Sequence, residues 1–517
     1  MRFPEINSPW PPKEYAPALA QVANDDAWLT LGGPGVTTQV GPVVHPTQFN
    51  GGLVGAGARA LLGKPPSARG TISDQRHLDL ASQLVDAKAT MVAGKPPIVS
   101  LHEDDADNAK AIEALNALVG TDTFAAEYTT AVGKSGSHGW RFGRVVWNQQ
   151  VYEHPWVEWV DADGGFSMRE NGREVAVMFW DAHQGQKDTE VYRLFQLHVP
   201  GRIEYQLYLG DQNTVGRPVP FEEHQATAYL ADLVDAESGF DTGIPPELGI
   251  ITATMIPNGD VNPAWRSHPQ LRYYGRSDVD KGRHVWADLD SVHSDFIHDV
   301  GSARARLFVN EGLLDNLKPG DGQWFDQMRD VYRIAESGTP SENQIERVQF
   351  QIRAEDYLRA RNQLILDGVD AVGLSPITVG KDHDATGTMT AREITARSKK
   401  SLETFNKVAR QERAGLSRIL TAWLWLDADL NNYAPPTRPI LVALHEPVDQ
   451  TALELAEEIE ALHRSDSISM WYRVRKAHPE WDEPEVNAEV ERIRADLQAG
   501  MPTDPFSIGM DIDPEES

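Results

Sequence analysis

The longest helical pattern in the chain lies between residues 390 and 430. No glycine or proline interrupts Met389–Ala414, and apolar residues recur three, four, seven or eight positions apart. This spacing keeps one apolar stripe on one side of a helix. The residues of the stripe are Ile394, Leu402, Phe405, Val408, Leu416, Ile419, Leu420, Trp423 and Leu424. The pattern predicts one long packed helix, reciprocally capped by Thr390 and Glu393, with Gly415 as the place for a bend.

Two shorter helical patterns precede it and flank a compact segment. The first covers residues 282–307, and the second begins at a capping box of Ser341 and Gln344 and ends at Asp367, before Gly368. The first pattern carries the apolar residues Trp286, Leu289, Val292, Phe296, Ile297 and Val300. Between the two, residues 308–340 predict a small irregular excursion. The sequence therefore predicts helix, excursion, helix, loop and long helix in that order.

Strand-like runs dominate an earlier region. Two helices are predicted first, over Asp104–Val119 and through Phe124, Tyr128 and Val132. Five strands follow, at residues 144–148, 156–160, 175–180, 191–199 and 202–209. Pro200 and Gly201 separate the last two, so these form a hairpin. An antiparallel sheet beside helices makes the expected fold class α+β.

The two ends of the chain carry weaker signals. Residues 1–100 are rich in proline and glycine and predict two short helices within irregular structure that lies on other surfaces. Residues 440–444 predict a strand, followed by three helices up to about residue 500. The acidic tail, 501–517, has few apolar residues, and we expect it to be disordered.

This order of elements resembles a known family. Gly373–Gly380 reads GLSPITVG, a short polar loop follows, and TAREI at Thr390–Ile394 opens the long Thr-, Lys- and Arg-bearing helix. The arrangement resembles tailed-bacteriophage portal proteins of the SPP1-like type, especially those of phages and prophages of actinobacteria. The resemblance covers most of the chain and is strongest over 277–430. It implies a portal fold with an α/β wing, a helical stem, a small clip, a long kinked helix and a helical crown.

The resemblance also implies domain boundaries. They are an irregular N-terminal region (1–100), the wing (101–281), a stem helix (282–307), the clip (308–340), a second stem helix (341–368), the tunnel loop (373–389), the long wing helix (390–430), the crown (431–500) and the acidic tail (501–517).

Family membership would make the chain a structural subunit of a virion. Portal subunits form a ring, dodecameric in the family, at one capsid vertex, through which double-stranded DNA is packaged and ejected. The implied partners are further copies of the chain, the large terminase subunit, a head-tail adaptor and the major capsid or scaffold protein. Assembly would take place in the host cytoplasm. No catalytic residue and no cofactor or metal is expected, because ATP hydrolysis belongs to the terminase.

The resemblance points to two sets of candidate residues. The tunnel loop projects into the channel in this family, so Lys381 and His383 are candidates for phosphate contact. If they have no such role, the basic residues of the long helix are the next candidates, beginning with Arg392, Arg397, Lys399 and Lys400. In the clip, Asp321, Trp324 and Phe325 stand around two glycines and are candidates for docking another protein.

Composition narrows the possible functions. The chain has 517 residues, 48 Lys and Arg against 77 Asp and Glu, and a net charge of −29. Tight nucleic-acid binding relies on cations that replace counterions on phosphates, so this charge argues against an ordinary high-affinity nucleic-acid binder. Contact of the tunnel loop with DNA, which the resemblance implies, should be transient and independent of base sequence. The segment from Thr390 to Arg418 is the exception, with eight basic and three acidic residues.

Other site types find little support. The chain has no cysteine, its 16 histidines form no ligand pattern, and no apolar run is long enough to cross a membrane. Gly55–Pro66 resembles a phosphate-binding loop, but the glycine spacing is one residue too long and Pro65 stands at the metal-binding position.

Two alternatives stay open. Trp147, Trp156, Trp159 and Trp180 lie on predicted strands among many carboxylates, which is compatible with a carbohydrate-active enzyme that uses a pair of acids. The second alternative is another capsid or scaffold protein.

Overall fold

The computed structural model describes residues 3–30, 76–148, 151–185, 187–234, 239–302, 306–310, 331–334, 345–348, 353–381, 391–447, 459–460, 463–464, 468–478 and 483–499. The fold is α+β, as the sequence predicted. The chain divides into two compact units: Met1–Thr386 with Ala396–Pro447, and Gly387–Thr395 with Val448–Ser517.

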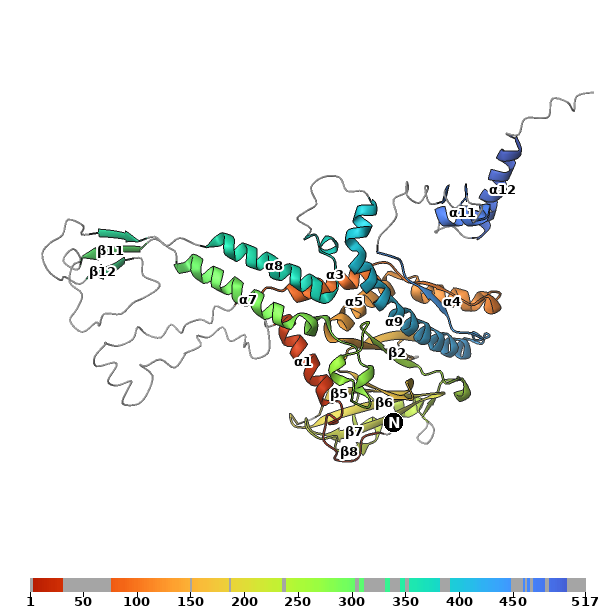
Figure 1. Ribbon diagram of the computed structural model, residues 1–517. Coiled ribbons are helices and arrows are strands. Elements are labelled where there is room, and N and C mark those ends of the chain that lie inside the picture. The colour runs from red at the N-terminus through yellow and green to blue at the C-terminus, as the bar shows by residue number, and fades with distance from the viewer. Residues whose placement is uncertain are drawn as a thin grey trace, which may run out of the picture. The chain divides into compact units, whose positions relative to one another are not determined.

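The larger unit holds most of the regular structure (Figure 1). Its helices are α1 (Ala16–Thr30), α3 (Leu80–Ala93), α4 (Ala109–Val119), α5 (Asp122–His138), α6 (Leu230–Leu233), α7 (Asp278–Ser302), α8 (Ala354–Val372) and, from Ala396 onward, α9 (Ala391–Asn431). Its strands are β1 (Ile98–Ser100), β2 (Trp140–Val146), β3 (Trp156–Val160), β4 (Gly165–Glu170), β5 (Arg173–Gln184), β6 (Val191–Val199), β7 (Arg202–Gly210), β8 (Arg217–Val219), β9 (Phe240–Asp241), β10 (Ala253–Pro257), β11 (Arg306–Asn310), β12 (Val331–Ile334), β13 (Ile345–Val348) and β14 (Leu441–Ala443).

Two antiparallel sheets, out of the four sheets in the described residues, hold most of the strands. One has the order β10-β2-β3, and the other has the order β4-β5-β6-β7-β8, with β9 also paired to β7. The predicted hairpin of β6 and β7 is confirmed, with Val199 opposite Arg202 across the turn. Gly201 has φ of 84°, a conformation that favours glycine. β3 and β6 have the predicted bounds, whereas β2 and β5 begin earlier than predicted.

Apolar side chains from both faces of the β10-β2-β3 sheet build two cores. One face packs on α4, α5 and α9, and the other face packs on the six-stranded sheet. The first core includes Phe124, Tyr128, Val145, Val157, Leu416, Ile419, Leu420 and Trp423. The second includes Trp140, Phe142, Phe166, Phe179 and Phe195. The apolar stripe predicted on the long helix is therefore a core face of the larger unit.

Gly415 has a packing role within α9, a helix that continues past it to Asn431. A Cβ at Gly415 would lie 2.5 Å from Cδ1 of Ile256 on β10. The missing side chain therefore lets the long helix approach the sheet closely.

α7 and α8 lie side by side (Figure 1). They are antiparallel, because Trp286 of α7 packs at Gly368 of α8 while Asp299 accepts a hydrogen bond from Tyr357 at 2.9 Å. The prediction that α8 starts at Ser341 and stops before Gly368 is wrong at both ends. The helix begins at Ala354 and continues through Gly368 to Val372. Gly368 makes room for the Trp286 ring, since a Cβ there would lie 2.6 Å from it.

The segment between α7 and α8 contains strands where the sequence pattern predicted irregular structure and the start of a helix. β11 pairs in parallel with β12 and antiparallel with β13. Pairing with a distant strand thus outweighed the local capping signal at Ser341 and Gln344.

The N-terminal region contains helices, as predicted, but the packing of α3 differs from the prediction. α3 is a core helix with eight buried residues, in a segment expected to lie as irregular structure on other surfaces. It packs with α7 and α8 through Leu84, Val85, Trp286, Leu289 and Val369. The predicted strand near residue 440 is present as β14, which pairs antiparallel with β1.

In the smaller unit, α11 (Met470–Ala477) and α12 (Glu483–Ala499) share a small core of Val474, Val486 and Val490. The first predicted crown helix is largely outside the described residues, as is the acidic tail.

Candidate functional site at the junction of α8 and α9

The segment after α8 turns sharply and returns to α9. Gly373 ends α8 with φ of 86°, and the backbone N–H of Leu374 donates to the carbonyl of Val369 at 3.0 Å. A Cβ at Gly373 would lie 2.7 Å from Oγ1 of Thr404. Both the backbone angle and the space therefore require glycine at this position.

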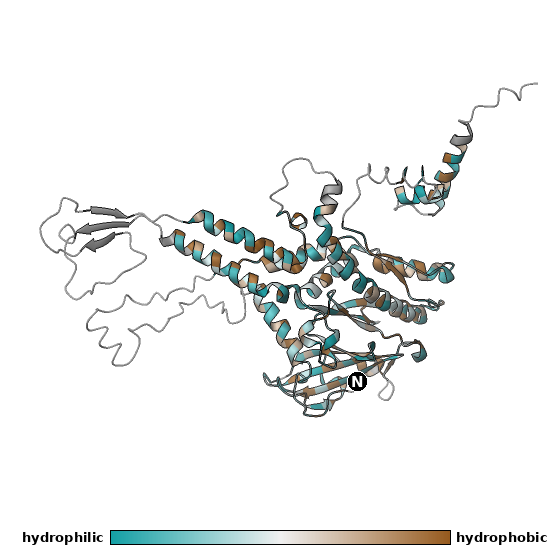
Figure 2. Cartoon of the chain, in the orientation of Figure 1, coloured by the Kyte–Doolittle hydropathy of each residue, from teal (hydrophilic) through white to brown (hydrophobic). Residues whose placement is uncertain are grey.

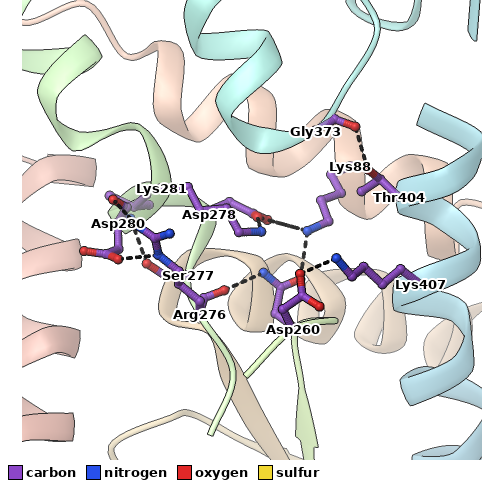
Figure 3. A network of polar contacts seen from close by, with 12 residues as sticks. Lys88, Asp260, Arg276, Ser277, Asp278, Asp280, Lys281, Gly373, Thr404 and Lys407 are labelled. Atoms are coloured by element: carbon purple, nitrogen blue, oxygen red, sulfur yellow. Dashed lines mark hydrogen bonds and ion pairs between the residues drawn. The ribbon is translucent and has the colours of Figure 1, made fainter. Parts of the chain in front are cut away.

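Four hydroxyl side chains fasten the turn to α9. Thr404 donates to the carbonyl of Gly373 at 2.6 Å (Figure 3). The N–H of Ser375 donates to Oγ of Ser401 at 2.8 Å, and the N–H of Ser401 donates to Oγ of Ser375 at 3.3 Å. Thr378 adds a hydroxyl contact to Ser401 at 2.7 Å.

These hydrogen bonds fix the turn Gly373–Lys381 against α9, and we call this turn and the residues that hold it the base of the junction. Ser375 and Ser401 are each 2% exposed, so their hydrogen bonds are shielded from water. The 3-10 turn η7 (Pro376–Val379) follows, and Lys381 donates its N–H to the carbonyl of Pro376 at 2.9 Å. The turn Gly373–Lys381 is thus tied to the part of α9 that holds Ser401 and Thr404.

The predicted DNA-contact residues near this base differ in exposure and in their partners. Lys381 is half-buried at its edge, and Lys399 is exposed and faces Glu403 at 3.9 Å. Lys400 pairs with the carboxylate of Asp370 and also donates to the carbonyl of that residue at 2.9 Å. Arg397 is half-buried and has an interaction partner. Two of these cations therefore already have a carboxylate neighbour within the chain.

The remaining predicted site residues lie where the side chains are not described. His383 is outside the described residues, and so are Asp321, Trp324 and Phe325. Arg392 belongs to the first turn of α9, where the structure describes the backbone and not the side chains.

A buried ion cluster that the sequence analysis missed lies close to this junction (Figure 3). Lys88 of α3 donates to both carboxylate oxygens of Asp278 on α7, at 2.7 and 3.0 Å, and to Oδ1 of Asn258 at 2.9 Å. Lys281 donates to the same carboxylate at 2.7 Å. The cluster ties α3, α7 and the end of β10 together. A lone lysine on an amphipathic helix carries no signal in the sequence that it will be buried.

Burial and charge act against each other in this cluster. Burial lowers the pKa of the Lys88 ammonium, and the Asp278 carboxylate opposes this shift. Burial alone would raise the pKa of Asp278, but the ammonium groups of Lys281 and Lys88 together hold that pKa below its ordinary value. Asp278 therefore stays ionised at neutral pH and carries the contacts between the elements.

The tryptophans behind the carbohydrate-enzyme alternative do not share one cleft. Trp180 packs with Trp10 and Phe166, and Trp147 packs with Phe240. Trp156 and Trp159 line a surface pocket of about 390 Å³ together with Glu127 and Glu158. Glu158 accepts a hydrogen bond from Nε of Arg144 at 2.8 Å, so one of the two carboxylates of this pocket is held in an ion pair.

Metal-ligand clusters and membrane-spanning helices are both absent from the described part of the chain. Within it, His, Asp and Glu residues nowhere gather in a group of three or more that could hold a metal ion. None of the helices described combines the length and apolar character needed to span a membrane.

Comparison with known proteins gives structural likenesses at low sequence identity. No family model and no curated protein matches the chain. A chain from the virion of a native gene transfer agent particle is 13% identical, with a TM-score of 0.41 over 88% of this chain and 98% of that one. A chain from the neck of an empty particle of this kind, computed with C6 symmetry, is 14% identical, with a TM-score of 0.40 over 83% and 96%. A chain from the neck of the native particle, computed with C12 symmetry, is 12% identical, with a TM-score of 0.38 over 90% and 96%.

Proposed function

We propose that the chain is a portal-type subunit, which forms a ring at one vertex of a phage-like capsid and lets DNA pass. The observation that carries this proposal is the order of elements around the α8–α9 junction. An antiparallel helix pair has a small three-stranded sheet inserted between its members, and a fastened turn then leads into a 41-residue helix. The motifs GLSPITVG and TAREI stand at this turn and at the start of this helix.

The surface of the α7–α8 pair supports assembly into a ring. Hydrophobic and hydrophilic residues alternate along both helices (Figure 2). Val300 on α7 is 41% exposed and Leu358 on α8 is 47% exposed. Large apolar side chains gain free energy when a partner covers them, and a neighbouring copy of the same surface is the proposed partner. A closed ring of twelve copies is the expected assembly.

The charges around the junction support passage rather than tight binding. The net charge is −29, and Lys399 and Lys400 each have a carboxylate neighbour. A DNA phosphate that approaches must compete with these carboxylates, so contacts through Lys381, His383 and the start of α9 are weak and independent of base sequence. Such contacts suit a channel through which DNA slides.

The docking role rests on the segment between α7 and α8. We assign Asp321, Trp324 and Phe325 to a surface that the large terminase subunit and then a head-tail adaptor contact, while capsid or scaffold protein surrounds the ring. In this function the chain is a passage and a platform, located in the virion after assembly in the host cytoplasm.

Replacing Trp324 and Phe325 with Ala should leave rings intact and weaken terminase or adaptor binding.

Ring formation is the direct test. Purified protein should show rings with a central hole in negative-stain images. Leu358→Glu places a charge on the exposed face of α8 and should shift the protein toward the 57.3 kDa monomer in light scattering. Leu248→Glu is the matched control, since Leu248 is 52% exposed outside α7 and α8, and it should leave rings unchanged. A wild-type protein that stays monomeric over a wide concentration range, with or without capsid protein, contradicts the proposal.

The channel role has a separate test. Replacing Lys381 and His383 with Ala should alter DNA packaging or retention while rings and helical content stay unchanged. Normal yields of particles that hold a full genome would remove the DNA-contact role from these two residues and leave ring formation untouched.

A further inference from the structure

β3 is an edge strand. Its sheet has the order β10-β2-β3, and within the described residues no strand pairs with the other side of β3. An edge strand carries a row of backbone donors and acceptors that another extended chain can use.

The backbone of β2 shows which groups of β3 face outward. The N–H of Val145 donates to the carbonyl of Thr252 at 2.8 Å, so Val145 directs its backbone groups toward the β10 side of β2. Successive residues of a strand direct these groups to opposite sides, and Arg144 therefore bonds toward β3. Arg144 lies opposite Glu158 in the register. Glu158 consequently faces β2, and the N–H and C=O groups of Val157 and Trp159 face the free edge.

A groove runs along this free edge. The pocket of about 390 Å³ is lined by four consecutive residues of β3, Trp156 to Trp159, and by one side of α5. Its volume lies within the range of about 300–1,000 Å³ found for binding pockets. The α5 side is formed by Ala126, Glu127, Thr130, Ala131 and Lys134. Short side chains at three of these five positions leave space between the helix and the strand.

The side chains around the groove favour a basic occupant. Glu127 is exposed, and Glu158 has a side chain that is 42% exposed. The one lysine of the lining, Lys134, pairs with Asp161 at 2.7 Å. Trp156 and Trp159 offer aromatic surface that attracts cations. The indole N–H of Trp159 is buried and has no hydrogen-bond partner within the described structure.

We propose that the groove between α5 and β3 binds an extended segment of a partner protein, which adds to the sheet at Val157 and Trp159 and places a Lys or Arg side chain between Glu127 and the tryptophans. Backbone hydrogen bonds provide the docking, and the charged side chain provides the selectivity. The proposal commits to this occupant because Glu127 carries a negative charge that no cation among the described residues balances, whereas Glu158 and Lys134 already have partners in Arg144 and Asp161. It does not depend on the portal assignment.

The probe is a short labelled peptide of alternating valine and lysine, added to the full-length protein and followed by fluorescence anisotropy. Two further peptides accompany it: one with glutamate in place of lysine, and one with alternate backbone nitrogens methylated. The valine–lysine peptide should bind saturably and slow amide exchange at Val157 and Trp159. The other two should bind at least about tenfold more weakly.

Variants on α5 locate the binding. Thr130→Arg fills the groove, and Glu127→Lys reverses its charge; each should weaken the valine–lysine peptide by about tenfold or more. Thr123→Arg is the matched control, because Thr123 is exposed on α5 and lies seven residues before Thr130, outside the groove lining. It adds the same charge and should leave binding unchanged. Circular dichroism confirms that all three variants are folded.

Four results would overturn the proposal. Equal binding of the methylated peptide would show that the strand edge is not used. Equal binding of the glutamate peptide would show that basic side chains are not selected. Equal weakening by Thr123→Arg and Thr130→Arg would indicate general attraction to a negatively charged protein. If Val157 and Trp159 are protected from amide exchange without peptide, and this protection increases with protein concentration, the groove binds a second copy of the chain.

Discussion

Arg141 of β2 and Glu412 of α9 form a two-pronged ion pair inside the core. Nη1 of Arg141 donates to Oε1 of Glu412 at 2.7 Å, and Nη2 donates to Oε2 at 2.6 Å. Both side chains are almost completely shielded from solvent, at 1% and 0% exposure. The pair connects the β10-β2-β3 sheet to the long helix α9, and its two residues are 271 positions apart in the sequence.

Neighbouring groups make further contacts with this pair. Nη1 of Arg141 also donates to Oγ of Ser135 at 3.1 Å, and the hydroxyl of Tyr128 donates to Oε2 of Glu412 at 3.3 Å. The guanidinium lies 5.0 Å from the centre of the Trp159 ring. Burial alone would lower the pKa of Arg141, but the Glu412 carboxylate reverses this shift and raises it. Arg141 therefore keeps its positive charge inside the core.

Glu412→Gln should lower the free energy of unfolding by about 3–5 kcal/mol, because it leaves the Arg141 charge buried and unpaired. The double variant Arg141→Met with Glu412→Leu should recover much of that loss, since it removes both charges. Urea unfolding followed by circular dichroism measures both. Lys187→Ala, which removes an exposed pair with Glu190, is the control and should have no measurable effect. A loss below about 1 kcal/mol for Glu412→Gln would show that the pair behaves like a surface contact.

Gly415→Ala should destabilise the protein by about 1–3 kcal/mol, because the added methyl overlaps Ile256. In an Ile256→Ala background, which carries its own cavity cost, Gly415→Ala should destabilise the protein less, since the side-chain atoms that clash are gone. Gly133→Ala provides a matched helix glycine, where a Cβ would meet its nearest atom at 3.7 Å, an ordinary contact. It should be neutral or stabilising. Equal effects of the two alanine substitutions would contradict the packing role of Gly415.

Asp25 should make the stability of the protein depend on pH. It lies on α1 at 1% exposure, near Asp280 and Arg283 of α7, and burial raises its pKa from 3.8 to about 7. The folded state then holds a proton that the unfolded chain releases, so this contribution to stability is complete below pH 3.8 and is lost as the pH rises to about 7. The loss is on the order of 4 kcal/mol, at roughly 1.4 kcal/mol per pKa unit.

Asp25→Asn removes this dependence because the amide does not ionise. The variant should be more stable than the wild type at about pH 8, and the difference should shrink toward about pH 4. Urea unfolding of both proteins between about pH 4 and pH 8 measures this difference in stability. Asp26→Asn, at a neighbouring carboxylate with a 57% exposed side chain, is the control and should leave the wild-type profile in place. A difference between Asp25→Asn and wild type that stays constant with pH would refute the expectation.

Ser401→Ala should loosen the base of the α8–α9 junction. It removes the acceptor for the N–H of Ser375 and the contact with Thr378, at a cost of about 1–3 kcal/mol for a buried donor left without a partner. Hydrogen exchange over Gly373–Lys381 should become faster, while exchange in the sheet core stays unchanged.

Glu403→Ala is the control for this substitution. Glu403 is exposed on the same helix, and its removal should not change exchange at Gly373–Lys381. If Ser401→Ala exchanges at the wild-type rate, the apolar contacts of Leu374 hold the turn without the hydroxyl groups.

Local patterns were sufficient to predict much of the secondary structure. The apolar stripe of α9, the alternation in β6 and β7 and the turn at Gly201 each depend on spacing along the chain, because a side chain's face follows directly from the helix or strand period. Element order also led to the α+β class, which is confirmed, and to the portal resemblance, which stays a proposal.

Contacts between distant segments determined the rest. Gly368 lies inside a helix because Trp286 needs its space, and residues 345–348 form a strand because β11 pairs with them. The burial of Lys88 and Glu412 depends on which elements surround them. β3 has a free edge because, among the described residues, only β2 pairs with it. A residue's own neighbours in sequence carry no information on such partners. The reason is that the free energy of burying a charge or filling a gap is set by atoms that only folding brings together.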